Sequence, residues 1–528
     1  MRQTFTWFIS SLTTITIVAA PCWSLDKSVR NLGIDADYLH KKPYNLTGQK
    51  IAIGQVEIGR PGKFGFDKIV NWNPNFQLAG IYYQNKIAKA NSNLDNHAAM
   101  VAAVMISKDK KLRGVAPNAK LYSSAVGALK GSGQPQECLT SQHIAQQNGG
   151  DLRAINFSFG ESLEQDHQKD YKLDGSSLLT QCIDWSSRVH NTLYVIAGNQ
   201  GQGGIPIPTD HYNGITTAYT TKQEGIYKKV DFTNLSALPI GVGRSLIKRE
   251  INFGKRRAIN LVAPGGKVSI YDLSGTIQNV SGTSFAAPHI TASVALLQEF
   301  GDRQLKYKKP NWSLDSRRHE VSKAVLLNSA DKLQDNGDGY LLNMTRTIFS
   351  KSHYNWLQSE AYHNPEIPVD IQMGIGQLNV LRAYQQFSAG QWKPNNLVSS
   401  IGWDYGSVTR NNSRDYSISK PLHKNTYISI TLVWDRLTEL NDKNANQKYD
   451  LGESFNNKGL NNLDIFLMPT KANNISQSIC SSVSRVDNLE HIFCTIPKTD
   501  YYKIRVQYTK QINRPYQPYA LAWWGVSD

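Results

Sequence analysis

The hydrophobic pattern divides the chain into two parts with different periods. Up to about residue 387, short continuous apolar runs such as 50–57 and 192–199 alternate with segments whose apolar residues recur every three or four positions. Continuous runs are typical of strands buried on both faces, and the longer period is typical of helices. Strands that alternate with helices predict an α/β fold, in which a parallel sheet carries helices on both faces.

The pattern changes to that of an all-β protein from about residue 390 onward. Apolar residues there alternate or form short runs between turn residues, at 427–434, 463–468, 502–506 and 519–524. Runs of this length between turn signals predict strands. A chain of 528 residues is long enough for roughly two to four domains, so the change of pattern indicates a second domain.

The stretch 281–297 combines a small-residue turn with a helix. Gly282-Thr283-Ser284 precedes an Ala-rich run whose apolar residues recur at helical spacing, and Pro288 lies about one turn in, where a helix tolerates a missing N–H. Ser284 is thus expected at a helix N-terminus, beside free backbone N–H groups and the positive end of the dipole. That position can stabilise an oxyanion, although an ordinary turn before a core helix is the alternative interpretation.

Composition and charge describe an ordinary globular chain with a basic excess. Hydrophobic residues make up 40% and charged residues 19%, which excludes a disordered chain. The 58 Lys and Arg against 42 Asp and Glu give a net charge of +16, spread along the chain in short clusters such as 255–257. No signature of a nucleic-acid-binding fold surrounds these clusters. We therefore expect no nucleic-acid partner and only a general attraction to anionic surfaces or substrates.

Residues 1–24 have the features of a secretory signal peptide. Met1-Arg2 precedes an apolar run that ends at Ala20, and 22–24 offers a small-x-small cleavage site. No other run is long and apolar enough to span a bilayer. We therefore expect a secreted protein, extracellular or periplasmic, without a membrane span.

Four cysteines follow that segment, at positions 138, 182, 480 and 494. An even count in an exported protein favours disulfides over free thiols. Sequence proximity favours Cys480 with Cys494, which leaves Cys138 with Cys182. Four cysteines allow three connectivities, so the other pairings stay open.

Several segments resemble, in the same order, the motifs of the subtilisin-like serine peptidases. The stretch 281–297 resembles the nucleophile motif of that family. Other strands and turns of the family are matched here by the segments 113–122, 154–160, 192–199, 260–266 and 374–379. The region 200–260 diverges most and contains a strand-like run at 236–243. The resemblance covers about 49–387 and implies the parallel sheet of that family.

The resemblance also implies a domain organisation. The all-β part resembles the sandwich that follows the catalytic domain in some extracellular members of the family. We therefore expect a signal peptide at 1–24, a peptidase domain at 25–390 and a jelly-roll-like β-sandwich domain at 391–528.

The family motifs imply a triad of Ser284, His97 and Glu57, with Asn199 as an oxyanion donor. Ser284 matches the nucleophile, and His97 matches the general base that begins the histidine helix. Asn199 ends an Ala-Gly-Asn strand, as does the residue whose side chain donates to the oxyanion in the family.

Two departures from the family pattern concern the acid and the histidine helix. The family's acid is Asp, within Asp-Thr-Gly or Asp-Ser-Gly, and the matching tripeptide here is Glu57-Ile58-Gly59. The Gly-Thr-His that follows the family's first histidine is lost at 98–100. A Glu can orient a histidine as an Asp does, but its side chain is longer by one methylene.

The same resemblance implies how a substrate would bind. Ser158, Phe159 and Gly160 match a family strand whose backbone pairs with an extended peptide, and Ala197-Gly198 immediately precede the oxyanion donor. Such pairing gives affinity, while side-chain pockets give specificity. The implied partners are protein or peptide substrates, and no organic cofactor is implied.

The loop 442–453 has the ligand spacing of an EF-hand calcium loop. Oxygen-bearing side chains fall at positions 1, 3, 5, 9 and 12, and position 7 offers a backbone carbonyl. These ligands are Asp442, Asn444, Asn446, Lys448, Asp450 and Glu453. The Gly expected at position 6 is Gln447, and no flanking helices are evident. A solvated Asx-rich loop is the alternative to a structural calcium site.

These features predict a secreted serine endopeptidase that hydrolyses peptide bonds through a Ser-His-acid triad with Glu in place of Asp. The alternative is a catalytically weak or inactive relative that acts as a protein- or surface-binding module. Glu57 and the altered 98–100 favour that alternative, whereas the retained nucleophile and base favour the enzyme.

Overall fold

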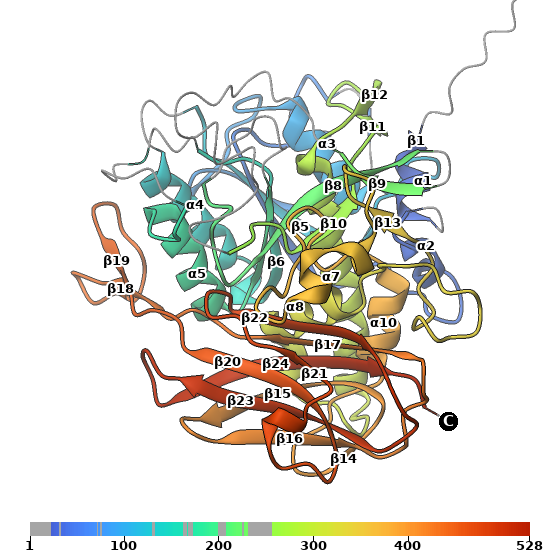
Figure 1. The fold of residues 1–528 in the computed structure, drawn as a ribbon. Helices are drawn as coiled ribbons and strands as arrows, with labels where there is room; N and C mark the ends of the chain where they lie inside the picture. Colours follow the sequence, from blue (N-terminus) through green and yellow to red (C-terminus); the bar gives the residue numbers. More distant parts are fainter. Residues whose placement is uncertain are drawn as a thin grey trace, which may run out of the picture.

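The computed structural model describes residues 23–30, 33–70, 72–73, 76–128, 133–161, 166, 173–198, 207–223, 226–230 and 256–527. Three predictions fall outside these residues: the signal peptide up to residue 22, Asn199, and the strand at 236–243. The described chain forms an α/β part followed by a β part, coloured orange to red in Figure 1, that lies against it.

A sheet of ten strands forms the centre of the first part (Figure 1). Its spatial order is β13 (Ile348–Phe349), β9 (Ile226–Lys229), β8 (Ile215–Gln223), β7 (Leu193–Ala197), β6 (Leu152–Phe157), β2 (Ala52–Glu57), β5 (Lys120–Ala125), β3 (Leu78–Tyr83) and β4 (Lys86–Ile87), with β10 (Leu261–Pro264) beside β8. From β8 to β3 each neighbouring pair is parallel. Every position of β2, β6 and β7 is buried, which explains the continuous runs in the sequence.

Helices cover both faces of this sheet. On one face lie α3 (Asn96–Ile106) and α7 (Thr283–Lys306), and on the other lie α4 (Gln134–Ala145) and α5 (Leu178–His190). Strand β7 shows the two faces, because its residues 193, 195 and 197 join the core of α3 and α7, whereas 194 and 196 join the core of α4 and α5. The predicted parallel sheet with helices on both faces is confirmed.

The second part is a sandwich of two sheets. One has the order β15 (Ile401–Thr409), β24 (Tyr516–Gly525), β17 (Tyr427–Val433) and β22 (Leu489–Thr495). The other has the order β14 (Leu397–Val398), β16 (Ser413–Ile418), β23 (Tyr502–Lys510), β20 (Asn462–Pro469) and β21 (Cys480–Ser482). Side chains from both sheets form one apolar core, so the predicted all-β sandwich is confirmed.

Shorter elements complete the described chain. The helices are α1 (Leu25–Val29), α2 (Ala36–His40), α8 (His319–Asn328), α9 (Glu360–His363) and α10 (Val380–Ser388), with 3₁₀ turns at Asn148–Gly150, Leu314–Arg317, Trp356–Gln358 and Ile475–Gln477. The strands are β1 (Trp23–Ser24), β11 (Val268–Tyr271) and β12 (Ile277–Val280), which form a small sheet, and the hairpin of β18 (Thr438–Asn441) and β19 (Ser454–Asn457).

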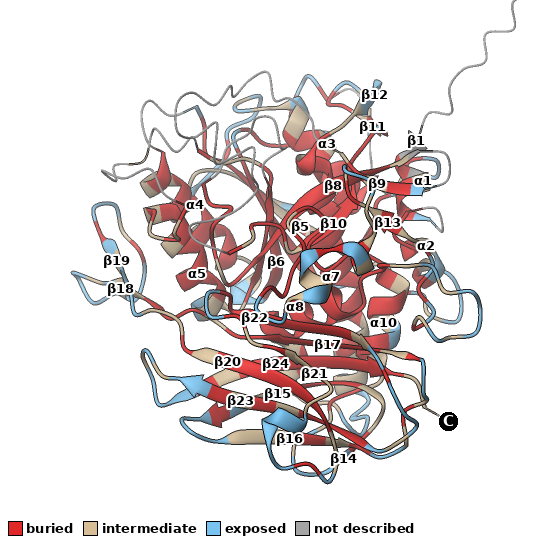
Figure 2. Ribbon diagram, in the orientation of Figure 1, coloured by how far each residue is buried: buried red, intermediate tan, exposed pale blue. Residues whose placement is uncertain are grey.

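Helix α8 lies at the junction of the two parts. It contacts β24, β17 and β15, and all of its residues are buried (Figure 2). The side chain of Asn328, at its C-terminal end, accepts hydrogen bonds from the hydroxyls of Ser429 and Thr431 on β17, both at 2.9 Å. The sandwich therefore packs directly on a core helix of the first part.

Two disulfides link neighbouring elements. Cys138–Cys182 joins α4 to α5, and Cys480–Cys494 joins β21 to β22. Of the three possible connectivities, the structure thus forms the one that sequence proximity favours.

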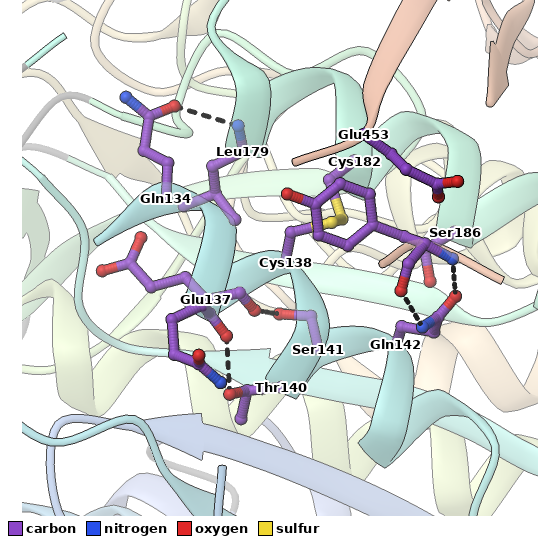
Figure 3. The surroundings of a disulfide bond; sticks show 12 residues. Gln134, Glu137, Cys138, Thr140, Ser141, Gln142, Leu179, Cys182, Ser186 and Glu453 are labelled. Atoms are coloured by element: carbon purple, nitrogen blue, oxygen red, sulfur yellow. Dashed lines mark hydrogen bonds between the residues drawn. A yellow bond between two sulfur atoms is a disulfide. The ribbon is translucent and has the colours of Figure 1, made fainter. Parts of the chain in front are cut away.

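The surroundings of the first disulfide connect the two parts of the chain (Figure 3). The side chain of Gln142 on α4 donates to the carbonyl of Tyr449 at 3.0 Å and accepts the Tyr449 N–H at 2.6 Å. Tyr449 belongs to the loop between β18 and β19 and is fully buried. The hairpin of the second part is therefore seated on the disulfide-linked helices of the first.

Candidate active site

Glu57 and His97 meet at the carboxyl edge of the central sheet. Glu57 is the last residue of β2 and is 1% exposed, while the side chain of His97, near the start of α3, is 36% exposed. Glu57 Oε2 lies 3.4 Å from His97 Nδ1. That separation exceeds the roughly 2.7–2.9 Å of a charge-assisted hydrogen bond. The longer acid thus reaches the histidine, through a long contact.

Asp95 and Gly59 fix the position of α3 beside Glu57. The Asp95 carboxylate caps the helix by accepting the Ala98 N–H at 2.8 Å. A Cβ on Gly59 would lie 2.3 Å from the Cβ of Asp95. The third residue of the strand-end tripeptide must therefore be glycine, because the cap of the histidine helix passes directly over it.

The charges around His97 favour its protonated form. Burial disfavours the imidazolium, but the carboxylates of Glu57 and Asp95 outweigh that effect and raise the pKa of His97 above its ordinary value. Burial raises the pKa of Glu57, against the opposing effect of His97. A histidine with a raised pKa is a stronger proton acceptor once it is neutral.

Ser284 lies at the N-terminus of α7, as predicted. Gly282 precedes the helix with a φ of 154°, a backbone conformation that L side chains rarely adopt. The Gly282 N–H donates to the carbonyl of Gly265, just beyond β10, at 2.9 Å. The turn is thereby held against the sheet, and Ser284 is presented at the end of the helix where backbone N–H groups are free.

Two reciprocal hydrogen bonds join Ser284 to Ser158, the residue that follows β6. The Ser284 hydroxyl donates to the Ser158 carbonyl at 3.2 Å, and the Ser158 hydroxyl donates to the Ser284 carbonyl at 3.1 Å. Pro288 explains the second bond, because its nitrogen has no hydrogen to donate to the carbonyl four residues earlier. The proline inside α7 thus frees a carbonyl that Ser158 occupies.

His97 and Ser284 are neighbours without a mutual hydrogen bond. The His97 ring contacts Phe285, the residue after Ser284, edge to face with ring centroids 5.6 Å apart. Between these described residues, the serine hydroxyl is engaged by Ser158 and the histidine by Glu57. Catalytic hydrogen bonds often form only when substrate is bound, and rotation of the Ser284 hydroxyl would turn it from Ser158.

The two predicted substrate-binding segments follow adjacent parallel strands, β6 and β7. After β6, Ser158 is buried whereas Phe159 and Gly160 are partly exposed. After β7, the Gly198 N–H donates to the Thr217 carbonyl at 2.8 Å, and a Cβ on Gly198 would lie 2.7 Å from that oxygen. The two segments therefore lie side by side at the edge that carries Glu57.

Two residues that help to position the side chains of this site, Asp95 and Asn156, were not predicted from the sequence. An Asp just before an apolar helical run is a cap signature, which could have identified Asp95. The amide of Asn156 donates to the Ser158 hydroxyl at 2.9 Å and holds it toward Ser284. Pro288 could have indicated that the Ser284 carbonyl needs a side-chain donor such as Ser158, since a proline inside a helix leaves the carbonyl four residues earlier unpaired.

The loop 442–453 lies outside this site, between β18 and β19. Asp442 accepts the N–H groups of Asn446 and Gln447, at 3.2 and 2.7 Å. Gln447 takes the left-handed φ of 62° at the position where an EF-hand loop has glycine. The Asp450 carboxylate accepts both the Asn444 and Asn446 amides, at 2.8 and 2.6 Å. Positions 3, 5 and 9 thus face one another.

A model described as the subtilase family matches residues 71–344, slightly more than half of the chain. The parallel sheet with helices on both faces, and the place of Ser284 at a helix N-terminus near His97 and Glu57, agree with this match. The chain belongs to the subtilase family.

Several known proteins are similar to this chain. The alkaline protease of Alkalihalobacillus alcalophilus is 24% identical over 240 residues, which cover 45% of this chain and 52% of that protein. Subtilisin Savinase of Lederbergia lenta is 24% identical over 45% of this chain and 73% of its own length, and subtilisin DY of Bacillus licheniformis is 28% identical over 50% and 81%. Among solved structures, the prenylagaramide maturation protease PagA is 20% identical, with a TM-score of 0.40 over 65% of this chain and 95% of that one. The chain spans about half the length of the first of these relatives.

Proposed function

We propose that the chain is an active serine endopeptidase. The observation that carries the proposal is the contact of buried Glu57 with His97, next to a serine at the N-terminus of α7. In this reaction Ser284 Oγ attacks the scissile carbonyl carbon while His97 Nε2 takes the hydroxyl proton. His97 then gives that proton to the leaving amine, and a water molecule repeats the two steps to release the new carboxylate.

Glu57 acts on His97 rather than on the substrate in this proposal. Its carboxylate beside Nδ1 keeps Nε2 available to the serine and stabilises the imidazolium that forms. The oxyanion would be bound by the Ser284 backbone N–H and by Asn199. An extended substrate would pair with the backbone of 158–160 and 197–198.

A fluorophosphonate probe tests for an activated serine. We expect the purified chain to be labelled, the label to map to Ser284, and Ser284→Ala to abolish it. Ser293→Ala is the matched control, since this buried serine on the same helix donates only to the His289 carbonyl in the structure. Digestion of a protein substrate that stops in Ser284→Ala would complete the assignment.

Failure of the labelling would favour the binding-module interpretation. If the folded protein resists the probe, cleaves no peptide and still binds an extended peptide, the cleft serves recognition and not hydrolysis. The departures at Glu57 and 98–100 would then be the first positions to revert toward the family pattern.

We also propose that the loop 442–453 holds a structural calcium ion. Calcium takes six to eight oxygen ligands, and the loop brings three carboxylates and two side-chain amides into one turn. Glu453, at position 12, accepts the N–H groups of Lys443 and Asp450 and so closes the two ends of the loop. These contacts support an ion held by Asp442, Asn444, Asn446, Asp450, Glu453 and the Lys448 carbonyl.

Calcium removal should lower the melting temperature of the whole chain. We expect EDTA to reduce Tm, excess calcium to restore it, and Asp442→Asn to remove the calcium dependence. Asp335→Asn is a suitable control because this acid caps a different loop through the N–H groups of Gly337 and Gly339. A Tm that calcium leaves unchanged would favour the solvated loop.

Export and domain boundaries complete the proposal. Among the described residues, no helix is long and apolar enough to cross a membrane. The two disulfides support an oxidising compartment. We propose removal of 1–24, a peptidase domain at 25–390 and a sandwich domain at 391–528. N-terminal sequencing of the secreted product should begin at residue 25, and recovery of the chain in the cytoplasm with 1–24 attached would contradict export.

A further inference from the structure

We propose that a protonated histidine, His319, links the two parts of the chain, and that this link is lost as the pH rises. His319 begins α8 of the first part and lies between Glu320 of the same helix and Asp435, which follows β17 of the sandwich. The three side chains are nearly enclosed, with 1%, 8% and 10% exposed, respectively. The proposal is independent of the chemistry of Ser284.

Both ring nitrogens of His319 face oxygen atoms that accept hydrogen bonds. Glu320 Oε2 and Asn191 Oδ1 each lie 3.2 Å from Nδ1, and Asp435 Oδ1 lies 3.1 Å from Nε2. The Asn191 oxygen is identified by its second contact, since it accepts the backbone N–H of His319 at 3.0 Å. A neutral imidazole carries one N–H, and only the imidazolium carries two. The arrangement therefore calls for the charged form of His319.

The two acids depend on this cation for their charge partner. Glu320 Oε2 and Asp435 Oδ2 are buried and make no hydrogen bond within the described part of the chain. Glu320 Oε1 accepts only a long contact of 3.5 Å from the Tyr405 hydroxyl. If His319 loses its proton, two buried carboxylates face a neutral ring, and a buried charge without its partner is costly.

Other cations surround the acids without pairing directly with them. Arg318, just before α8, lies over the Tyr405 ring at 4.6 Å, and Arg188 of α5 donates to the Thr438 carbonyl at 2.8 Å. Lys323 of α8 donates to the Tyr212 carbonyl at 2.7 Å. A cavity of about 240 Å³ beside the acids is lined by these two arginines, by Tyr405 and by Arg514. Among the described residues, His319 alone forms an ion pair with either acid.

The balance of these charges sets the direction of the pH dependence. Burial is the largest single effect on His319 and disfavours its charge, as does Arg318, but Glu320 and Asp435 together raise the pKa of His319 above 6.5. Because this pKa is higher in the folded than in the unfolded chain, folding takes up the proton. The resulting stability is complete below the ordinary pKa of 6.5 and is lost as the pH rises through the folded-state pKa. Burial also raises the pKa of Glu320 above 4.5, so its effect begins at lower pH.

The proton acts on the segment that leads from β17 to the β18–β19 hairpin. Next to Asp435, Arg436 forms an ion pair of 2.5 Å with Asp184 of α5, and its N–H donates to Asn213 Oδ1 at 2.8 Å. Residues 435 and 436 thus both fasten the sandwich to the first part. We expect deprotonation of His319 to weaken this junction, while Arg436 keeps the two parts together.

Nuclear magnetic resonance of isotope-labelled histidine tests the protonation directly. The full chain carries Ser284→Ala to prevent self-digestion, and His319→Gln identifies the His319 signals by their loss. An ordinary histidine is half protonated at about pH 6.5. We expect His319 to be an imidazolium at that pH and to titrate at higher pH, and Asp435→Asn to move the titration to lower pH. A neutral His319 at pH 6.5 would overturn the proposal.

Urea unfolding in the same background tests whether the proton stabilises the junction. From about pH 6.5 to 9, the unfolding constant of the chain with His319 should rise relative to that of His319→Gln, by up to tenfold per pH unit. His353→Gln changes an exposed histidine outside the junction and should keep this pH dependence. Circular dichroism establishes that each variant is folded, and Asp435→Asn serves if His319→Gln is not. The same pH dependence with and without the two substitutions at the junction would contradict the role of His319.

Discussion

At the scale of single residues, Glu57 is the most informative departure from the family pattern. Glu57 is fully enclosed at the end of β2, and one carboxylate oxygen reaches His97 while Oε1 has no hydrogen-bond partner among the described residues. The extra methylene is thus accommodated by the end of the strand, with a 3.4 Å contact as the result. The charge of the acid is retained, and its geometry is looser.

Replacing Glu57 by Gln should reduce kcat by roughly 10³- to 10⁴-fold, as loss of the acid does in other Ser-His-acid triads. The neutral amide neither stabilises the imidazolium nor fixes the tautomer of His97. Glu57→Asp keeps the charge at shorter reach, so we expect it to retain more activity than Glu57→Gln. Steady-state kinetics on a peptide substrate decide the point, and wild-type turnover in Glu57→Gln would exclude Glu57 from the mechanism.

The raised pKa of His97 predicts the pH dependence of cleavage. Only neutral His97 can accept the serine proton, so kcat/KM should fall as the pH drops through a pKa above the ordinary value of 6.5. Because the Glu57 carboxylate supports this shift, Glu57→Gln should move the acid limb of the profile to lower pH. A limb that stays in place in this variant would mean that another group controls it.

The positions proposed for the triad could be selected from the sequence because each lies within a short local motif. Ser284 and His97 mark the starts of two helices, and Glu57 marks the end of a strand. By contrast, the cluster of His319 with Asp435 joins positions 116 residues apart and carries no local pattern. Contacts of this kind arise from the packing of one domain on another, which periodicity does not encode.

At the scale of elements, the nucleophile helix depends on its link to β6. Ser158→Ala removes the donor to the Ser284 carbonyl and leaves that carbonyl without its side-chain partner. We expect a loss of about 1 kcal/mol in the free energy of unfolding. Ser187→Ala is a matched control, because this hydroxyl is buried without a hydrogen-bond partner among the described residues. Chemical denaturation that gave equal losses for both variants would contradict the role of Ser158.

The two disulfides should differ in their contribution to stability. Cys138–Cys182 closes a sequence separation of 44 residues and Cys480–Cys494 one of 14. Loop-closure entropy then predicts losses of about 4 and 3 kcal/mol, respectively, when each pair is replaced by Ser. Urea unfolding of the two double variants measures the difference. A larger loss from the second pair would show that native packing, and not chain entropy, dominates.

At the scale of the whole molecule, the contacts of the sandwich with the peptidase part include a helix of that part and a hairpin of the sandwich. Helix α8 lies on the β17 and β24 sheet, and the β18–β19 hairpin reaches across to α4 and α5 (Figures 1 and 2). The second contact centres on Tyr449, whose ring stacks on Phe455 with centroids 5.4 Å apart, while Phe455 contacts Trp185 of α5. The change of period near residue 390 predicted a second domain, but the hairpin's docking is a tertiary contact that it could not reveal.

Tyr449→Ala should therefore weaken the attachment of the hairpin to the peptidase part. The substitution empties a fully buried aromatic site, for which the expected loss is about 3–5 kcal/mol. Tyr449→Phe is the matched control, since the Tyr449 hydroxyl is buried without a hydrogen-bond partner among the described residues and its removal should cost little. In the Ser284→Ala background, which prevents self-digestion, limited proteolysis should cut Tyr449→Ala within 438–457 faster than either wild type or Tyr449→Phe. Equal cleavage rates in all three would mean that the hairpin lies on α4 and α5 without contributing to the union of the two parts.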